Sequence, residues 1–288
     1  MFIAMLSVLL SGAQAELATG PMQCVAEGFK FTEGPLWLPS NVLIFSDIPA
    51  DTIYRADKSI FRKPSGCSNG LTLDPQGRLI AAEHKNRRVS RTEADGTVIA
   101  VADRFEGKRL NSPNDVVVRS DGTIFFTDPP YGLEGGLTGP NAELDFAGIF
   151  FITPKGEVHC LARDFKKPNG LTLSPDEKIL YVGDCESSLI KAFELNSDGS
   201  SKSTRMLCEI QHPDGMKADE RGNIWSTAKE GIRVISPKGE LVQAIAFSQQ
   251  TTNCAFGGPD GTTLYVTTPD AVYSMPARVH SATWAMKK

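Results

Sequence analysis

The sequence predicts an all-β fold, a six-bladed β-propeller with about four strands in each blade. The main observation is an internal repeat along the whole chain: a polar residue, a short apolar strand, a turn rich in Gly, Asp or Pro, and a second strand. Repeats of about 40 to 50 residues are typical of propeller blades. The copies of this repeat begin at Glu33, Asn69, Asn114, Asn169, Asp214 and Asn253.

The spacing of the copies is the second observation. The second strands begin at the apolar residues Leu43, Leu79, Ile124, Leu180, Ile224 and Leu264, so successive copies lie 36 to 56 residues apart. The distance from the polar start of a copy to its second strand is always 10 or 11 residues. A β-sandwich, the main alternative fold, does not explain six repeats kept in such close register.

Each copy contains a hairpin, and further strand-like runs lie between the hairpins. Asp121-Gly122 and Asp260-Gly261 supply turns with positive φ, which glycine adopts without steric cost. The additional runs, which bring each unit to about four strands, are residues 53–57, 89–93, 149–154, 189–195 and 232–237. One blade must be closed by strands from both chain ends, and residues 22–30 are the expected donor.

Residues 22–288 are expected to form this single propeller domain, and residues 1–15 are expected to be a signal peptide. The first segment is apolar and ends in Ala13-Gln14-Ala15, a small-residue cleavage pattern. It has no Lys or Arg at its start, so a misplaced start or a buried strand is the alternative. The sequence therefore predicts a periplasmic or secreted protein, or a cytoplasmic one if the leader is not cleaved.

Composition excludes several classes of protein. The 288 residues carry a formal net charge of −4, and short basic clusters such as residues 85–88 are typical of solvated loops, so nucleic acid is not an expected partner. No later segment approaches the ~20 apolar residues of a membrane span. The six cysteines form no CxxC pair, which argues against structural zinc. Most are expected to be small buried residues, and whether any two pair is left open.

The polar residue at the start of each copy predicts a ring at one mouth of the channel. The innermost strands of a propeller surround its axis, so equivalent positions of the blades face one another. All six residues have an oxygen acceptor, and Glu33 and Asp214 are carboxylates. The alternative is that Asn and Asp only start strands through local hydrogen bonds, which accounts poorly for Glu33.

This ring predicts a metal site. Two carboxylates that converge on one axis raise each other's pKa unless a cation compensates them. An all-oxygen ligand set of carboxylates and amides suits a hard cation. We therefore expect one divalent cation, with Ca²⁺ as the first choice and Mg²⁺, Mn²⁺ or Zn²⁺ as alternatives.

Six motifs around the ring positions are specific when taken together. They are TEGPLW (32–37), RLNSPNDVV (109–117), FTDPPYGL (126–133), KPNGLTLSPDE (167–177), HPDGM (212–216) and TNCAFGG (252–258). Through them the chain resembles the gluconolactonase branch of the SMP-30/gluconolactonase/luciferin-regenerating family, over nearly its whole length.

The resemblance implies a six-bladed propeller with one divalent metal on its axis, and hydrolysis of a small sugar lactone. By this resemblance the direct ligands are Glu33, Asn114, Asn169 and Asp214. Asn69 and Asn253 would face the channel or the substrate instead of the ion.

One position departs from the pattern of the family. Animal members that act on sugar lactones have an arginine two residues before the second ligand, where this chain has Ser112. Arg109 and Asn111, in the same loop, are the candidate substitutes for substrate contact.

Two further residues are candidates for substrate contact. Tyr131, in the stiff DPPYG segment, could lie over a sugar ring, or the segment could be only a rigid turn. His212 lies two residues before Asp214 and could reach the site if the segment is extended, or it could simply fill a loop. The other histidines, His84, His159 and His280, have no comparable placement.

The expected reaction is attack of water on the lactone carbonyl. Asp214 is expected both to contact the metal and to take the proton of the water. The sequence has no GxSxG elbow and no recognisable Cys–His nucleophile motif, so a covalent mechanism is not expected. The rivals are another lactonase, arylesterase or phosphotriesterase on the same scaffold, and a non-enzymatic calcium-binding propeller. The oligomeric state is left open.

Overall fold

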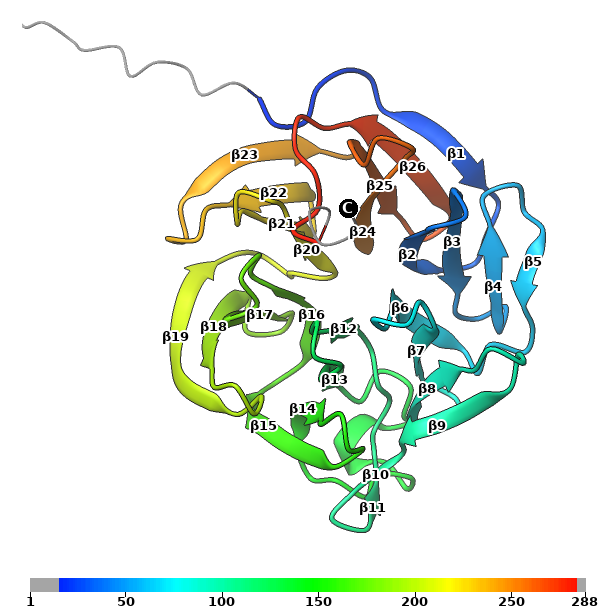
Figure 1. Ribbon diagram of the computed structural model, residues 1–288, viewed down its shortest axis with the longest axis vertical. Coiled ribbons are helices and arrows are strands. Elements are labelled where there is room, and N and C mark those ends of the chain that lie inside the picture. Colours follow the sequence, from blue (N-terminus) through cyan, green and yellow to red (C-terminus); the bar gives the residue numbers. More distant parts are fainter. Residues whose placement is uncertain (1–15, 284–288) are drawn as a thin grey trace, which may run out of the picture.

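The computed structural model describes residues 16–283, which form six four-stranded antiparallel sheets arranged around a central axis (Figure 1). Within these residues the other regular elements are one short 3₁₀ helix, η1 (Gly136–Thr138), and a hairpin of β10 (Arg104–Phe105) and β11 (Lys108–Arg109). The predicted six-bladed propeller is confirmed. The expected signal peptide, residues 1–15, lies outside the described residues.

The first three blades follow the chain in order. Blade 1 contains β2 (Thr32–Leu38), β3 (Val42–Asp47), β4 (Thr52–Arg55) and β5 (Ile60–Arg62). Blade 2 contains β6 (Ser68–Leu73), β7 (Leu79–Glu83), β8 (Arg88–Thr92) and β9 (Val98–Ala102). Blade 3 contains β12 (Val116–Val118), β13 (Ile124–Asp128), β14 (Ala147–Ile152) and β15 (Val158–Phe165).

The remaining blades complete the circle. Blade 4 contains β16 (Pro168–Leu173), β17 (Ile179–Asp184), β18 (Leu189–Leu195) and β19 (Ser201–Glu209). Blade 5 contains β20 (Met216–Ala218), β21 (Ile224–Ala228), β22 (Gly231–Ile235) and β23 (Leu241–Ala246). Blade 6 contains β24 (Asn253–Gly257), β25 (Thr263–Thr267), β26 (Ala271–Pro276) and, from the other end of the chain, β1 (Gln23–Glu27).

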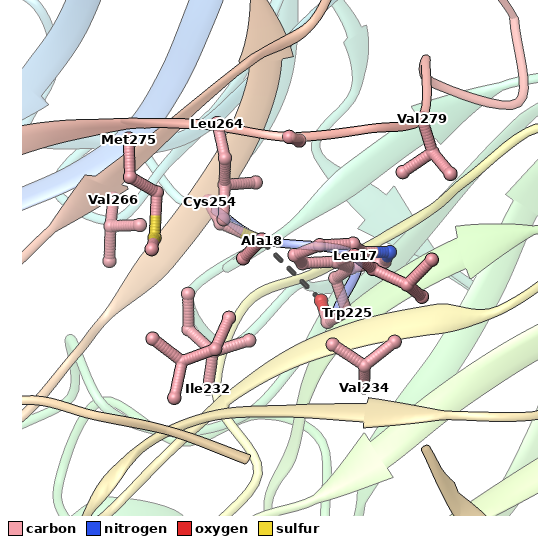
Figure 2. Close-up of a cluster of buried hydrophobic side chains, with 12 residues drawn as sticks. Leu17, Ala18, Trp225, Ile232, Val234, Cys254, Leu264, Val266, Met275 and Val279 are labelled. Carbon is pink, nitrogen blue, oxygen red and sulfur yellow. Dashed lines mark hydrogen bonds between the residues drawn. The ribbon is translucent and has the colours of Figure 1, made fainter. Parts of the chain in front are cut away.

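Blade 6 closes the propeller as expected, because β1 from residues 22–30 pairs antiparallel with β26. The packed structure begins ahead of residue 22. Leu17 and Ala18 are buried against Trp225 and its neighbours between blades 5 and 6 (Figure 2). Ala18 also forms a β-bridge with Ala277, which ties the two described ends of the chain together.

The core of the protein is divided among the interfaces between blades. Six clusters of buried apolar residues each join two neighbouring blades. Phe125 of blade 3, for example, packs in one cluster with Leu171 and Phe193 of blade 4. Because each blade is covered on both faces, the second strand is buried along its length, as in β13 (IFFTD) and β21 (IWSTA). This packing fixes the angle between blades and so the position of the innermost strands.

The channel has a cavity at the end away from the polar residues. Its volume is about 610 Å³, and it is lined by residues from the later part of every innermost strand. The C-terminal segment crosses this end, since Ser281 forms a bridge with Asp219 and the N–H of Ala282 donates to the carbonyl of Ala218 at 2.9 Å. We call this space the far cavity.

The sequence also leads to expectations about the cysteines and about membrane spans. All six cysteines are free, and only Cys254 is buried, so the expectation that most are buried is wrong. Cys24 is exposed and the other four are partly buried; of these, Cys160 and Cys208 pack at the edges of two clusters between blades. In residues 16–283 no helix has the length and apolar character needed to cross a membrane.

Candidate active site

The six polar residues predicted to face the channel lie at the start of the innermost strands, and all are buried. Glu33, Asn69 and Asn169 are the second residues of β2, β6 and β16, and Asn253 is the first of β24. Asn114 and Asp214 stand two residues before β12 and β20. We call these six residues the ring.

Glycines allow the ring to be narrow. In four blades the residue after the ring position is glycine: Gly34, Gly70, Gly170 and Gly215. A Cβ at Gly70 would lie 2.3 Å from Oδ1 of Asp115, and one at Gly215 would lie 2.0 Å from Cγ of Asn253. Only glycine therefore lets neighbouring innermost strands approach this closely.

Carboxylates at the ends of second strands hold the segments that lead into the ring. Asp47 accepts hydrogen bonds from the N–H groups of Lys30 and Phe31. Asp184 does the same for Lys166 and Lys167 in blade 4. These partly buried bonds fix the approach of the chain to Glu33 and to Asn169, because each carboxylate satisfies two main-chain donors.

Glu33 is a buried carboxylate with few compensating contacts. Its Oε2 accepts hydrogen bonds from the N–H of Gly34 at 2.7 Å and from Nδ2 of Asn253 at 2.9 Å. Burial raises the pKa of Glu33 to about 7, and the carboxylate of Asp115 adds to the rise. In the absence of a cation this position therefore disfavours the negative charge.

Asp214 shares this environment. Burial raises the pKa of Asp214 well above its usual value, and the charges of Glu33 and Asp115 raise it further. An interaction with the Asn169 side chain opposes the rise in this pKa. Carboxylates from opposite parts of the chain thus act on one another across the axis, as the repeat predicted.

Several buried oxygens at the ring lack a hydrogen-bond partner. They are Oδ1 of Asn69, Oδ2 of Asp115 and Oδ1 of Asp214. A buried acceptor without a partner costs free energy, about 1 to 3 kcal/mol for a neutral group. A hard cation on the axis would satisfy oxygens of this kind, so the donor set fits the predicted type of ion.

No group of three or more His, Cys, Asp or Glu side chains placed to hold a metal occurs in residues 16–283. The ring offers a different donor set, two carboxylates and the amides of four asparagines. Amide oxygens are ordinary ligands of Ca²⁺.

Tyr131 lies beside the ring and forms part of a wall at its mouth. Burial raises the pKa of the Tyr131 hydroxyl, and Cys185 and Asp214 add to the rise. His212 lies against the same wall, with Nδ1 3.9 Å from Sγ of Cys185. The structure therefore brings Tyr131 and His212 to the mouth, and Cys185 lies between them.

Ser112 holds the loop that carries Tyr131. Its hydroxyl donates to the carbonyl of Pro129 at 2.6 Å and accepts from the N–H of Gly132 at 2.8 Å. These two bonds bracket Tyr131, so the position of the aromatic ring depends on Ser112.

Arg109 and Asn111 are not brought to the ring. The guanidinium of Arg109 donates to the carbonyl of Asn86 at the outer hairpin. Asn111 is fully buried, and its Nδ2 donates to the carbonyls of Asp128 and Phe146. The side chain of Arg109 therefore braces the β7–β8 turn of blade 2, and the buried side chain of Asn111 braces blade 3, which leaves no direct substrate contact for Asn111.

Asn253 is also committed within the protein. Its Nδ2 donates to Glu33, and its Oδ1 accepts from the N–H of Cys254 at 2.8 Å. Asn253 therefore orients Glu33, whereas Asn69 keeps a buried oxygen without a partner.

Comparison with known proteins agrees with this geometry. Residues 31–270 match the family described as the SMP-30/Gluconolactonase/LRE-like region. The chain belongs to this family. A gluconolactonase of Zymomonas mobilis subsp. mobilis is 33% identical over 279 residues, covering 85% of this chain and 78% of the relative.

Two further proteins are similar over most of their length. The pentonolactonase XacC of Haloferax volcanii is 28% identical over 253 residues, covering 82% of this chain and 80% of the relative. The structure of the gluconolactonase XC5397 of Xanthomonas campestris superposes with a TM-score of 0.80 at 32% identity, covering 89% of each chain.

Two residues of this family member were missed by sequence reasoning. The sequence pattern predicts no place at the site for His84, yet its Nε2 lies 3.4 Å from Nδ2 of Asn69, and its buried ring packs under Gly132. Burial lowers the pKa of His84 to about 4. For Cys185 the sequence predicts only a small buried residue. Both directly follow the last residue of a second strand, Glu83 or Asp184, and that shared repeat position is the signal that could have found them.

Proposed function

We propose that this chain is a lactone hydrolase that acts on sugar lactones and depends on one divalent cation held by the ring. The observation that carries the proposal is the pair of buried carboxylates, Glu33 and Asp214: burial raises the pKa of both, and the charge of Glu33 raises the pKa of Asp214 further, so ionising both costs free energy. A divalent cation would remove that cost and would satisfy the oxygens that lack partners.

The substrate class is proposed from the relatives and from the mouth. The similar proteins include gluconolactonases and a pentonolactonase, which act on cyclic sugar esters of different size. The mouth offers an aromatic face, Tyr131, beside polar side chains such as Asn169 and His212. Such a combination suits a hydroxyl-rich ring, because the aromatic face packs on C–H groups and the polar groups bind hydroxyls.

We propose Glu33, Asn114, Asn169 and Asp214 as the residues that hold the cation, with Ca²⁺ as the first candidate. All four are ring residues with an oxygen donor, and the ring contains no thiolate or imidazole. Mg²⁺ demands a stricter octahedral arrangement than the asparagine-rich ring suggests, whereas Ca²⁺ accepts amide oxygens and waters in flexible geometry.

In the proposed reaction, the two ring carboxylates Asp214 and Glu33 have different tasks. When bound, the cation supplies Lewis-acid polarisation of the ester carbonyl and a lower pKa for nearby water. Asp214 takes the proton of the attacking water, since it is the ring carboxylate beside the mouth wall, and returns it to the ring oxygen of the lactone as the bond from the carbonyl carbon to that oxygen breaks. Glu33 is held by Asn253 and acts as a ligand only. A weak base such as Asp214 suffices because lactones are activated esters.

The wall positions the substrate. Tyr131 covers the sugar ring, and Ser112 keeps Tyr131 in place through the carbonyl of Pro129 and the N–H of Gly132. Where animal members of the family have an arginine, this chain thus uses a clamped aromatic loop.

This role of Ser112 gives a prediction. The S112A variant should raise KM for D-glucono-1,5-lactone about fivefold to tenfold and change kcat little, because loss of a buried hydroxyl costs about 1 kcal/mol of positioning. Steady-state kinetics checks it, with S120A at the other end of the channel as the control. An unchanged KM would show that the clamp does not position substrate.

The proposal is tested by metal removal and return. Chelator-treated protein should release acid from D-glucono-1,5-lactone no faster than the blank, and added Ca²⁺, Mg²⁺, Mn²⁺ or Zn²⁺ should restore turnover to different extents. A parallel panel of an aryl ester, a phosphotriester and a homoserine lactone separates the rival hydrolases. Metal binding without turnover of any substrate would favour a non-enzymatic propeller and overturn the proposal. Export, which depends on residues 1–15, stays a prediction.

A further inference from the structure

One charged side chain in the channel has no role in the proposed reaction. Three residues after each ring position the innermost strands contribute a second layer, which lines the far cavity: Leu36, Thr72, Val117, Thr172, Lys217 and Phe256. Lys217 is the one charged residue of this layer. It lies on β20, three residues after Asp214 and directly below the ring.

Lys217 has no acidic partner of its own. Its Nζ donates to the carbonyl of Met216 at 3.0 Å, and no ion pair of Lys217 is found among the described residues. The other charged groups that line the far cavity are already satisfied. Asp74 pairs with Arg78 and Arg119 pairs with Asp121, while Glu177 accepts hydrogen bonds from Ser120. The positive charge of Lys217 is therefore not neutralised by any one carboxylate, and it can act on the other charged groups of the channel.

Lys217 acts on the unbalanced charges at the ring. The charge of Lys217 lowers the pKa of Glu33, after the larger effects of burial, Asp115 and two hydrogen bonds. Asp115 is also buried, with Oδ1 accepting from the N–H of Val116 and Oδ2 lacking a partner. Its carboxylate lies in the space left by the missing side chain of Gly70.

The formal charges of the buried carboxylates and of Lys217 can be added to give the net charge of the channel. Glu33, Asp115 and Asp214 together carry three negative charges when ionised, and Lys217 carries one positive charge, so the channel is left with two negative charges. A divalent cation makes this group neutral. Without Lys217 the group would carry three negative charges and would match a trivalent cation.

We propose that Lys217, opposed by Asp115, sets the charge of the cation that the ring accepts. This inference rests on the proposed metal site and adds to it a residue outside the ligand set. Lys217 does not contact the ion in this account. It acts through the field in a buried channel, where charges are poorly screened by solvent.

The test uses direct binding of Ca²⁺ and Tb³⁺, two ions of similar size and different charge, to metal-free full-length protein by calorimetry and terbium luminescence. The K217M variant should bind Ca²⁺ about tenfold more tightly and Tb³⁺ roughly thirtyfold more tightly, because the Coulomb energy grows with the charge of the ion. D115N should weaken binding of both ions, again with the larger change for Tb³⁺. The double variant K217M/D115N should return both affinities toward the wild type.

Controls separate the possible outcomes. K238M removes the same charge from an exposed turn of blade 5 and should leave both affinities unchanged. Thermal unfolding of each variant excludes loss of the fold as a cause. If wild-type protein binds neither ion, the proposed function fails. If wild-type protein binds Ca²⁺ and K217M binds both ions as K238M does, only the role of Lys217 is overturned.

Discussion

Replacement of Asp214 by Asn should reduce kcat for D-glucono-1,5-lactone by roughly a thousandfold, the range over which a general base contributes. The amide keeps the size of the side chain and an oxygen toward the ring, but it cannot take a proton. The measurement is steady-state hydrolysis at saturating Ca²⁺, so that weaker metal binding does not limit the rate. The fold should be intact, because an uncharged side chain relieves the buried charge at this position.

A matched control is D57N, which makes the same change on an exposed turn of blade 1. It should have wild-type kcat. If D214N with bound Ca²⁺ keeps more than about a tenth of the wild-type kcat, Asp214 is not the base, and the proton must go to another group at the mouth such as His212.

The metal-free protein should become less stable, relative to its E33Q variant, as the pH rises from about 5 to about 8. The folded-state pKa of Glu33 is raised to about 7 by burial and by Asp115, so the folded protein binds more protons than the unfolded chain in this window. Stability from this group is therefore present below the unfolded pKa and is lost as the pH passes the folded pKa. The difference should be on the order of 2 kcal/mol.

Urea unfolding of both proteins across this pH range, with chelator and then with saturating Ca²⁺, measures the effect. Ca²⁺ should remove most of the pH dependence of the wild type, because bound cation keeps Glu33 ionised at low cost. If metal-free wild-type protein and E33Q show the same pH dependence, Glu33 is not held at an electrostatic cost, and the main argument for a cation at the ring fails.

The fold was predictable because each repeat contains its own strands and turns. The register of a polar start and a second strand 10 or 11 residues later is a local property, and six copies leave few architectures. The closing strand β1 was also expected, since one blade must be completed by the other end of the chain. Equivalent repeat positions then placed Glu33 and Asp214 on one axis without further information.

The contacts around the ring were less predictable, because the strands there are irregular. The pairing of β2 with β3 shifts between Glu33 and Leu36, and β6 and β16 show the same shift after Ser68 and Pro168. Such irregularities break the two-residue alternation from which side-chain direction is inferred. The alternation argument for His212 fails for the same kind of reason, because its φ of 49° is left-handed and not extended.

Residues that act through loops could not be placed from sequence either. Arg109 and Asn111 lie close to Asn114 along the chain, but their side chains turn to Asn86 and to Asp128 and Phe146. Ser112 instead clamps the loop of Tyr131 from 17 or 20 residues away. These contacts depend on how blade 3 folds its long loop back over the mouth, which no local pattern encodes.

Binding of one divalent cation by the ring can be observed by anomalous diffraction from a crystal soaked in Mn²⁺. We expect one strong peak on the propeller axis, about 2.0 to 2.6 Å from carboxylate and amide oxygens of Glu33, Asn114, Asn169 and Asp214. The same soak of E33Q should give a much weaker peak. A peak elsewhere on the molecule, or no peak at the ring, would mean that these oxygens do not bind the cation.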